Sequence, residues 1–275
     1  KAPEGYLQKG RIIMEGSVKT VGVLTSGGDA PGMNACIRAV VRSALNRGCR
    51  VMGIRKGYAG LLKGDVMEMN ATSVANIIHR GGTILYTARC PEFLEVEYQD
   101  RAAEMCRIFG IDGLVVIGGD GSFRGAQKLS QRGISVVGVP GTIDLDIVCS
   151  DYTIGFDTAV NVVVEAVSRL RDTSASHERC SVVEVMGRNC GEIALWSGIA
   201  TGADAIMIPE DAESQSFDHL VRVIMENRAR GKNHNIIIVA EGVGHAEELA
   251  KRIHEVTGIE SRATILGHIQ RGGRP

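Results

Sequence analysis

The chain has 275 residues, of which 44 % are hydrophobic and 23 % are charged, so it is long enough for about two domains with buried cores. Its formal net charge of −1 excludes a general electrostatic attraction to nucleic acid or to an anionic membrane surface. The seven cysteines form no C-x-x-C pair, which favours reduced thiols in a cytoplasmic protein over a disulfide framework or a zinc site.

The predicted elements begin after a polar, aperiodic leader at residues 1–18, which we expect to be disordered or non-native because it lacks a starting methionine. Short apolar runs then predict strands at Thr20–Thr25, Arg50–Ile54, Gly113–Ile117, Val136–Val139, Ser181–Val185, Ala205–Ile208, Asn235–Ala240 and Arg262–Leu266. Helical patterns lie between them at Gly32–Asn46, Ser73–Ile78, Gln99–Phe109, Phe123–Arg132, Asp157–Arg171, Cys190–Ala200, Phe217–Ala229 and Ala246–Thr257. This alternation predicts an α/β fold of mostly parallel sheets covered by helices on both faces.

Three glycine-rich turns follow predicted strands, at the sheet edge where ligands bind in such folds. They are Thr25–Gly32, Gly118–Ser122 and Gly141–Asp144. The first two open onto predicted helices, so backbone N–H groups and a helix N-terminus would face an anion. Asp120, between glycines, is placed to hold Mg²⁺ beside a polyphosphate. The alternatives are a plain strand–helix connection for the first turn, a buried N-cap of the helix from Phe123 for the second, and a solvated acidic loop for the third.

Charged side chains near the predicted strand ends complete this pattern. In an extended loop Asp144 and Asp146 would point to opposite sides, so one carboxylate can act as a base and the other can meet metal or scaffold. A guanidinium can grip a phosphate with two hydrogen bonds, and four arginines are candidates for that role: Arg179, Arg188, Arg262 and Arg271. Two phosphate cradles and a placed acid predict phosphoryl transfer.

Long stretches of the chain resemble one family. They are T-S-G-G-D-A-P-G-M-N-A, R-G-G-T-I-L-Y-T-A-R-C-P-E-F, V-V-I-G-G-D-G-S, P-G-T-I-D, T-I-G-F-D-T-A, S-H-E-R, E-V-M-G-R and L-G-H-I-Q-R-G-G. In this order, from about Lys19 to Pro275, they identify the chain as similar to the bacterial ATP-dependent 6-phosphofructokinases. The resemblance implies two three-layer α/β/α domains, one binding ATP and Mg²⁺ (19–156, with 269–275 returning to it) and one binding fructose 6-phosphate (157–268).

The resemblance also implies the site residues. ATP would lie against Gly28, Tyr58, Arg89, Cys90, Gly119, Asp120, Gly121 and Ser122, with Mg²⁺ at Asp120. Fructose 6-phosphate would meet Thr142, Ile143, Asp144, Met186, Gly187, Arg188, Glu241, His268, Ile269, Gln270 and Arg271. Its 6-phosphate would be reached by Arg179 and Arg262 of a neighbouring subunit in a homotetramer. Asp144 would be the base, and the transition state would be stabilised by Arg188, Thr142, Gly28 and Arg89.

Two glycine positions indicate which phosphoryl donor the chain uses. Relatives that use pyrophosphate carry an Asp where Gly121 stands and a Lys where Gly141 stands. A carboxylate at position 121 would repel the α-phosphate, so the resemblance implies ATP.

An effector pocket is also implied, in which ADP activates and phosphoenolpyruvate inhibits. Its matching residues are Arg38, Arg42, Arg171, Asp204, Arg230 and Lys232. One arginine of the family pattern is absent, because Ala71 stands in its place, so we expect a weakened pocket or one with a different ligand.

Two departures from the family pattern bear on activity. Leu145 stands where the family has Asn, between the two carboxylates, and we expect intact substrate binding with a lowered turnover. The chain also stops at Pro275 where relatives continue, so we expect exposed apolar surface and impaired assembly.

Two alternatives stay open beside the sugar-phosphate kinase. One is a lipid, NAD or other kinase that shares G-G-D-G-S, against which T-S-G-G-D, G-T-I-D and M-G-R argue. The other, motivated by Leu145 and the chain end, is a catalytically impaired or inert nucleotide-binding fragment.

Overall fold

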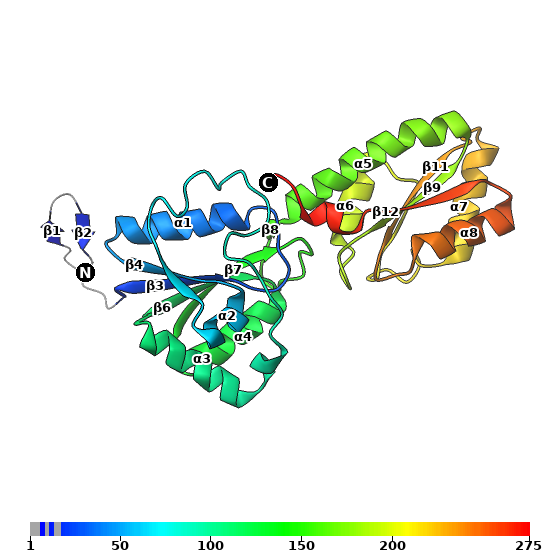
Figure 1. The fold of residues 1–275 in the computed structure, drawn as a ribbon. Helices are drawn as coiled ribbons and strands as arrows, with labels where there is room; N and C mark the ends of the chain where they lie inside the picture. The colour runs from blue at the N-terminus through cyan, green and yellow to red at the C-terminus, as the bar shows by residue number, and fades with distance from the viewer. Residues whose placement is uncertain (1–5, 9–10, 14–17) are drawn as a thin grey trace, which may run out of the picture. The chain divides into compact units, whose positions relative to one another are not determined.

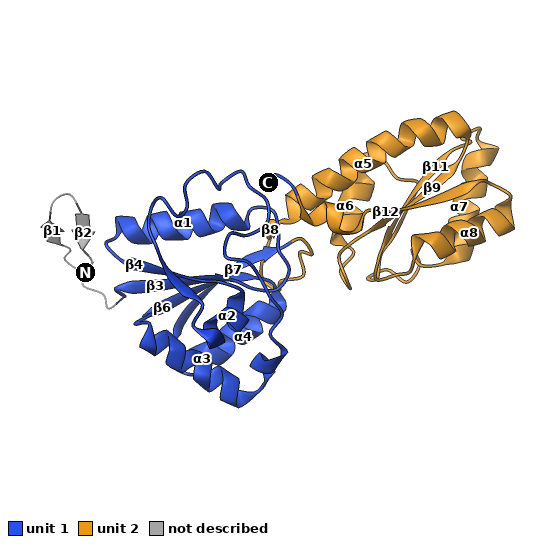
Figure 2. Cartoon of the chain, in the orientation of Figure 1, with its two compact units in different colours: residues 1–142, 273–275 blue, residues 143–272 orange. Residues whose placement is uncertain are grey.

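A computed structural model describes residues 18–275 of the chain and, before them, the backbone of β1 (Tyr6–Gln8) and β2 (Arg11–Ile13), which pair antiparallel. The rest of the predicted leader lies outside the described residues. The chain divides into two compact units, residues 1–142 with 273–275 and residues 143–272 (Figure 2). The functional division proposed at residues 156 and 157 stays a prediction.

Unit 1 is built on a sheet in which four neighbouring strands are parallel. Its strands are β3 (Thr20–Thr25), β4 (Arg50–Ile54), β5 (Val66–Met69), β6 (Gly113–Gly118) and β7 (Ser135–Thr142), in the order β5-β4-β3-β6-β7, and β5 runs antiparallel to β4. Helix α1 (Met33–Asn46) covers one face (Figure 1). The other face is covered by α2 (Gly57–Lys63), α3 (Val96–Ile108) and α4 (Asp120–Ser130), with the 3₁₀ turn η1 (Pro91–Leu94) before α3.

Apolar side chains in the core of unit 1 hold α2, α3 and α4 against the sheet. Leu24 and Val116 on the strands, Leu61 on α2, Ala102 on α3 and Leu129 on α4 have no exposed surface and belong to one cluster. The helical residues are apolar at the spacing that turns them toward the sheet, and the strand residues are apolar on the face that these helices cover.

Unit 2 has a four-stranded, wholly parallel sheet in the order β10-β11-β9-β12. The strands are β9 (Cys180–Val185), β10 (Ala205–Met207), β11 (Asn235–Ala240) and β12 (Ser261–Ile265). Helices α5 (Phe156–His177) and α6 (Glu192–Thr201) lie on one face, and α7 (Phe217–Ala229) and α8 (Ala246–Thr257) on the other (Figure 1). The two-residue strand β8 (Ile154–Gly155) precedes α5, and the 3₁₀ helix η2 (Gly267–Arg271) follows β12.

The predicted α/β class with mostly parallel sheets is confirmed. Every residue of β9 and β11 is buried, as the apolar run Ile236–Ala240 of β11 predicts for a strand covered on both faces; β9 also buries the polar side chains of Ser181 and Glu184. In the part of the chain that the structure describes, no helix is long and apolar enough to cross a membrane.

One predicted helix is wrong. Residues 73–78 form turns, although the Asn70 side chain accepts hydrogen bonds from the backbone N–H groups of Thr72 (2.9 Å) and Ser73 (3.0 Å) as a helix N-cap would. Asn76 then takes a left-handed backbone with φ 55°, which ends any helical path. Helix α2 and strand β5 were not predicted, since both are short.

Candidate functional site

The glycine turns of unit 1 meet at the carboxyl ends of β3, β6 and β7. The Ser26 N–H donates to the Ile117 carbonyl at 3.0 Å, which ties the first turn to the end of β6. A Cβ at Gly118 would stand 2.5 Å from the Ser26 carbonyl oxygen, so only glycine allows this approach. A Cβ at Gly119 would lie 3.6 Å from Thr142, which brings the third turn beside the second.

Two helix N-termini begin at this edge. Gly32, with φ 108°, precedes α1, and Gly119 precedes α4. Neither helix has a side-chain N-cap. Their first N–H groups and the positive ends of the helix dipoles therefore suit an anion, as the sequence predicts.

Asp120 opens α4 as its first residue. Its carboxylate pairs with Arg124 one turn later at 2.9 Å, and its side chain is 53 % exposed, so it is available to solvent. A Cβ on the neighbouring Gly121 would meet nothing within 4 Å, which leaves open space at the helix start. A single hard oxygen donor beside open space fits Mg²⁺, which proteins hold through one or two carboxylates and substrate phosphates. Within the described residues no three His, Cys, Asp or Glu side chains gather into a metal cage.

Tyr58, a predicted ATP contact, lies beneath the second turn. Its ring is 4 % exposed and stacks on Phe93 at 4.2 Å, and its hydroxyl donates to the Ser122 carbonyl at 2.6 Å. Burial raises the pKa of this phenol. Tyr58 therefore supports the Gly118–Ser122 turn from inside the unit. Among the other predicted contacts, Arg89 is exposed and Cys90 is half-buried, and burial raises the pKa of the Cys90 thiol.

Asp144 is a buried carboxylate of unit 2. Its side chain is 11 % exposed, and its Oδ2 lies 3.7 Å from Nε of Arg188. Burial raises the pKa of Asp144, and the neighbouring carboxylates Asp146 and Glu241 raise it further, whereas Arg188 and Arg271 lower it. The structure thus gathers five of the charged groups on which the sequence argument depends. A buried carboxylate with a raised pKa, beside guanidinium groups, suits a proton acceptor for a substrate that carries phosphate.

The loop after Asp144 departs from the extended conformation expected for it. Leu145 has φ 58°, in the left-handed region that non-glycine residues other than Asn and Asp rarely adopt. A left-handed residue breaks the two-residue alternation of side chains, so Asp144 and Asp146 are not held on opposite sides. Asp146 is close enough to raise the pKa of Asp144.

Glu241 follows β11 and anchors the loop after β9. Its Oε1 accepts hydrogen bonds from the N–H groups of Gly187 (3.1 Å) and Arg188 (2.7 Å). Both residues have left-handed backbones, with φ 143° at Gly187 and 55° at Arg188. The carboxylate thereby holds Arg188 in a conformation that places its side chain against Asp144. The sequence predicts Glu241 only as a contact of fructose 6-phosphate, and its support of the Gly187–Arg188 backbone was not predicted.

The remaining predicted sugar-phosphate residues divide by exposure. In η2, His268 and Ile269 are exposed, whereas Gln270 has no exposed surface and its Nε2 donates to the Gly267 carbonyl at 3.2 Å. Ile143 is buried, and Met186 and Thr142 are half-buried. The contacts predicted for them stay predictions.

Arg179 and Arg262 lie at the opposite edge of the unit 2 sheet. Arg179 precedes β9 and Arg262 is the second residue of β12, while Arg188 and Glu241 follow the carboxyl ends of β9 and β11. A strand of this length separates the two edges by roughly 17 Å. Both arginines pair with Glu260, at 3.0 and 2.6 Å, and together they lower its pKa. Glu260 was not predicted from the sequence, although an acid next to a strand-end arginine is a signal for such an ion pair.

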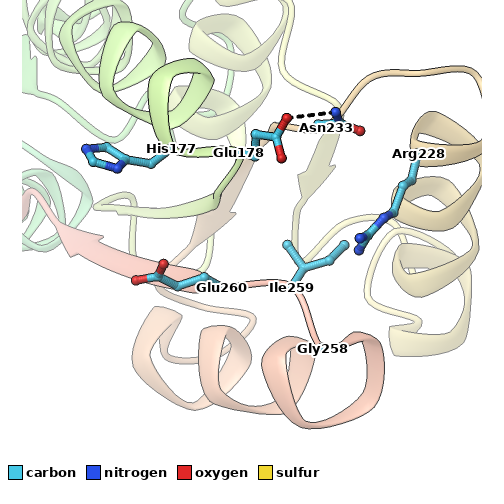
Figure 3. A pocket seen from close by; sticks show the side chains of 7 residues that line it. All are labelled: His177, Glu178, Arg228, Asn233, Gly258, Ile259 and Glu260. Atoms are coloured by element: carbon cyan, nitrogen blue, oxygen red, sulfur yellow. Dashed lines mark hydrogen bonds between the residues drawn. The ribbon is translucent and has the colours of Figure 1, made fainter.

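Glu260 also lines a polar pocket of about 180 Å³ at this edge (Figure 3). The other lining residues are His177, Glu178, Arg228, Asn233, Gly258 and Ile259, and Asn233 donates to Glu178 at 2.9 Å. None of the residues predicted to contact ATP or fructose 6-phosphate lines it.

The residues predicted for an effector pocket are distributed over both units. Arg38 donates to the Val74 carbonyl at 2.6 Å, and Arg42 is exposed. In unit 2, Arg171 donates to the Thr201 carbonyl, and Arg230 is exposed. Asp204 is buried and committed to internal contacts, with Asn227 at 2.8 Å, the Ile236 N–H at 2.9 Å, and Lys232.

Comparison with known proteins places the chain among relatives of one kind. The family described as Phosphofructokinase matches residues 20–275. An ATP-dependent 6-phosphofructokinase of Clostridium acetobutylicum is 63 % identical over 258 residues, which are 94 % of this chain and 80 % of that protein, and one from Clostridium botulinum is 62 % identical with the same coverage. Among solved structures, Pichia pastoris phosphofructokinase in the T-state superposes with a TM-score of 0.89 and 42 % identity, over 95 % of this chain and 31 % of the Pichia chain.

Proposed function

The chain belongs to the phosphofructokinase family, and we propose that it transfers the γ-phosphoryl group of ATP to the 1-hydroxyl of fructose 6-phosphate. The products are fructose 1,6-bisphosphate and ADP, so the protein is a phosphotransferase of glycolysis. One observation carries the assignment of the chemistry to this chain's own residues: the buried Asp144 carboxylate stands 3.7 Å from Arg188. A base next to a fixed cation is what an alcohol needs in order to attack a phosphoryl group.

Asp144 accepts the proton of the 1-hydroxyl in this proposal. Its raised pKa makes it a stronger base than an exposed aspartate, while Arg188 and Arg271 oppose that shift by favouring the charged carboxylate. Arg188, positioned by Glu241, also stabilises the charge on the transferred group. Fructose 6-phosphate binds along the same loops, with Arg271 and His268 following β12.

ATP binds at the glycine turns of unit 1. The N–H of Gly28 and the N-terminus of α4 bind phosphate oxygens, and Arg89 and Thr142 contribute to the stabilisation of the transition state. Asp120 holds Mg²⁺, which, when bound, offsets the negative charge of the triphosphate. The open space at Gly121 suits ATP, because a side chain there would approach the α-phosphate.

Arg179 and Arg262 bind the 6-phosphate from a neighbouring subunit, and the protein is a homotetramer. The support is their position: a single sheet separates them from Asp144 by about the length of β9, roughly 17 Å, so they cannot reach a sugar phosphate bound at Asp144 of their own chain. ADP and phosphoenolpyruvate act as effectors at Arg38, Arg42, Arg171, Asp204, Arg230 and Lys232. The protein works in the cytoplasm.

A coupled assay for fructose 1,6-bisphosphate tests the function. Product should form with ATP and Mg²⁺, should be absent with pyrophosphate, and should stop when EDTA removes the metal. No product with any donor would leave a nucleotide-binding fragment, and product with pyrophosphate alone would overturn the donor assignment.

A further inference from the structure

The first glycine turn of unit 1 is held by a segment distant in the sequence, residues 80–90. The Thr25 hydroxyl donates to the Tyr86 carbonyl at 2.9 Å and lies 2.9 Å from the Thr83 hydroxyl. Gly27 follows Thr25 by two residues, and its carbonyl accepts a hydrogen bond from the Thr87 hydroxyl at 2.5 Å. Each hydroxyl joins this segment either to the end of β3 or to the turn itself.

The start of the same segment is fixed from the opposite end of the turn. Asn34, in the first turn of α1, is 1 % exposed. Its amide nitrogen donates to the carbonyls of Arg80 (3.1 Å) and Gly81 (3.0 Å), and its amide oxygen accepts from the Ile84 N–H at 2.7 Å. One buried amide thus satisfies three backbone groups of the segment, which ties its geometry to the helix that follows the glycine turn.

The segment carries backbone strain next to its contact with the turn. Tyr86 has φ 56°, a left-handed conformation that is unfavourable for an L-residue with a bulky side chain. Neighbouring contacts hold it, since the Lys56 N–H donates to the Leu85 carbonyl at 2.7 Å and the Arg55 guanidinium lies 5.1 Å from the Tyr86 ring centre. Strained backbone of this kind persists where the surroundings fix a functional geometry.

Thr87 acts on the peptide unit between Gly27 and Gly28. In a trans peptide the carbonyl of one residue and the N–H of the next lie in one plane and point in opposite directions. The two glycines have no side chains that would oppose rotation of this plane, and Gly27 is already at φ 84°. A hydrogen bond to the Gly27 carbonyl therefore fixes the direction of the Gly28 N–H, away from Thr87.

We propose that Thr87 is a positioning residue for phosphoryl transfer: its hydroxyl locks the Gly27–Gly28 peptide so that the Gly28 N–H is presented to the phosphoryl group. Asn34 keeps the segment in register for this contact. The inference deepens the proposed function and rests on it. Preorganised N–H donors of this type act mainly on the transition state, so the effect falls on kcat more than on the binding of fructose 6-phosphate.

The test compares Thr87→Val, which keeps the shape and removes the donor, with Thr87→Ser, which keeps the donor. The loss of one hydrogen bond predicts a kcat about 3- to 10-fold lower for Thr87→Val, an unchanged KM for fructose 6-phosphate, and recovery to within about twofold in Thr87→Ser. Thr201→Val, which removes a hydroxyl bonded to the Ser197 carbonyl at 2.7 Å in unit 2, is the matched control and should keep parental kinetics.

Several outcomes overturn the inference while the proposed function stands. The first is a Thr87→Val enzyme with the parental kcat, and the second is a Thr87→Ser enzyme as slow as Thr87→Val. The third is a Thr87→Val enzyme with a lower kcat, a higher KM for both substrates and a lowered melting temperature, which indicates a structural role alone. A parent chain that forms no fructose 1,6-bisphosphate overturns the proposed function instead, so the two failures are distinguishable.

Discussion

Nε of Arg188 lies 3.7 Å from Oδ2 of Asp144, and the two partners differ sharply in exposure, at 69 % and 11 % of their side chains. The carboxylate therefore carries the cost of burial, whereas the guanidinium remains in contact with solvent. This asymmetry makes the protonation of Asp144 sensitive to its neighbours, and the first two predictions follow from it.

Replacing Asp144 by Asn should abolish most of the turnover while leaving the fold intact. Loss of a general base costs about 10²- to 10⁴-fold in kcat. Because the pKa of Asp144 is raised in the fold, the folded chain holds this proton more tightly than the unfolded chain, and stability falls as pH rises through the folded-state pKa. Asp144→Asn should thus raise the melting temperature at pH 7 and match the parent near pH 3. A variant that is less stable at pH 7 contradicts the role of burial.

Two neighbours should shift the acid limb of the pH–rate profile in opposite directions. Arg188 lowers the pKa of Asp144, so Arg188→Met should move the limb to higher pH. Asp146 raises it, so Asp146→Asn should move the limb to lower pH. The measurement is kcat against pH for both variants and the parent. Shifts of the same sign in both variants would rule out Asp144 as the titrating group.

Leu145→Asn should stabilise the chain and speed its turnover. The left-handed backbone at φ 58° costs leucine about 1–2 kcal/mol, and Asn tolerates it far better. We expect a gain of about 1 kcal/mol in the free energy of unfolding, read from denaturant melts. Leu145→Ile is the control and should lose stability, because a branched Cβ is worse in this region. If Leu145→Asn turns over no faster than the parent, Leu145 does not limit activity.

Gly121→Asp should weaken the binding of ATP without lowering the stability of the fold. A Cβ at this position meets nothing within 4 Å, so the melting temperature should change little, but the added carboxylate should repel the α-phosphate of ATP. We expect KM for ATP to rise about tenfold or more, with KM for fructose 6-phosphate near the parental value.

Gly125→Ala provides the contrast, because its Cβ would stand 2.8 Å from the Tyr58 ring beneath the same turn. This variant should lose about 1–3 kcal/mol of stability through overpacking. Equal melting temperatures for Gly121→Asp and Gly125→Ala would contradict the packing described for Tyr58.

Tyr58→Phe should weaken the second glycine turn from below. The phenol donates to the Ser122 carbonyl at 2.6 Å in a buried environment, so its removal takes away one buried hydrogen bond from a carbonyl in the first turn of α4. A loss of about 0.5–1.5 kcal/mol is expected in a thermal melt, with a rise in KM for ATP. An unchanged melting temperature would mean that water replaces the hydroxyl.

The sequence by itself determined the fold class, the family and the chemistry-bearing turns. Unbroken apolar runs such as Ile236–Val239 predict strands buried on both faces, and glycines at 27, 28, 118 and 119 mark where a chain must approach another backbone or an anion. These features are local, because each depends on which side chains a short segment carries. The helix expected at 73–78 does not form, because Asn76 takes a left-handed backbone that the apolar pattern does not predict.

Only the tertiary structure decided which of these residues act on one another. Arg188 and Glu241 are far apart in sequence, and their contact exists because β9 and β11 are adjacent parallel strands that end at one edge. The strand order of unit 2 also places Arg179 and Arg262 at the other edge of that sheet, and the fold of unit 1 brings Thr87 to Gly27. The left-handed backbone of Leu145 is likewise visible only in the structure. The residue type sets what each side chain can do chemically. Burial and strand order decide which groups lie next to that side chain, and those neighbours determine its pKa and its orientation.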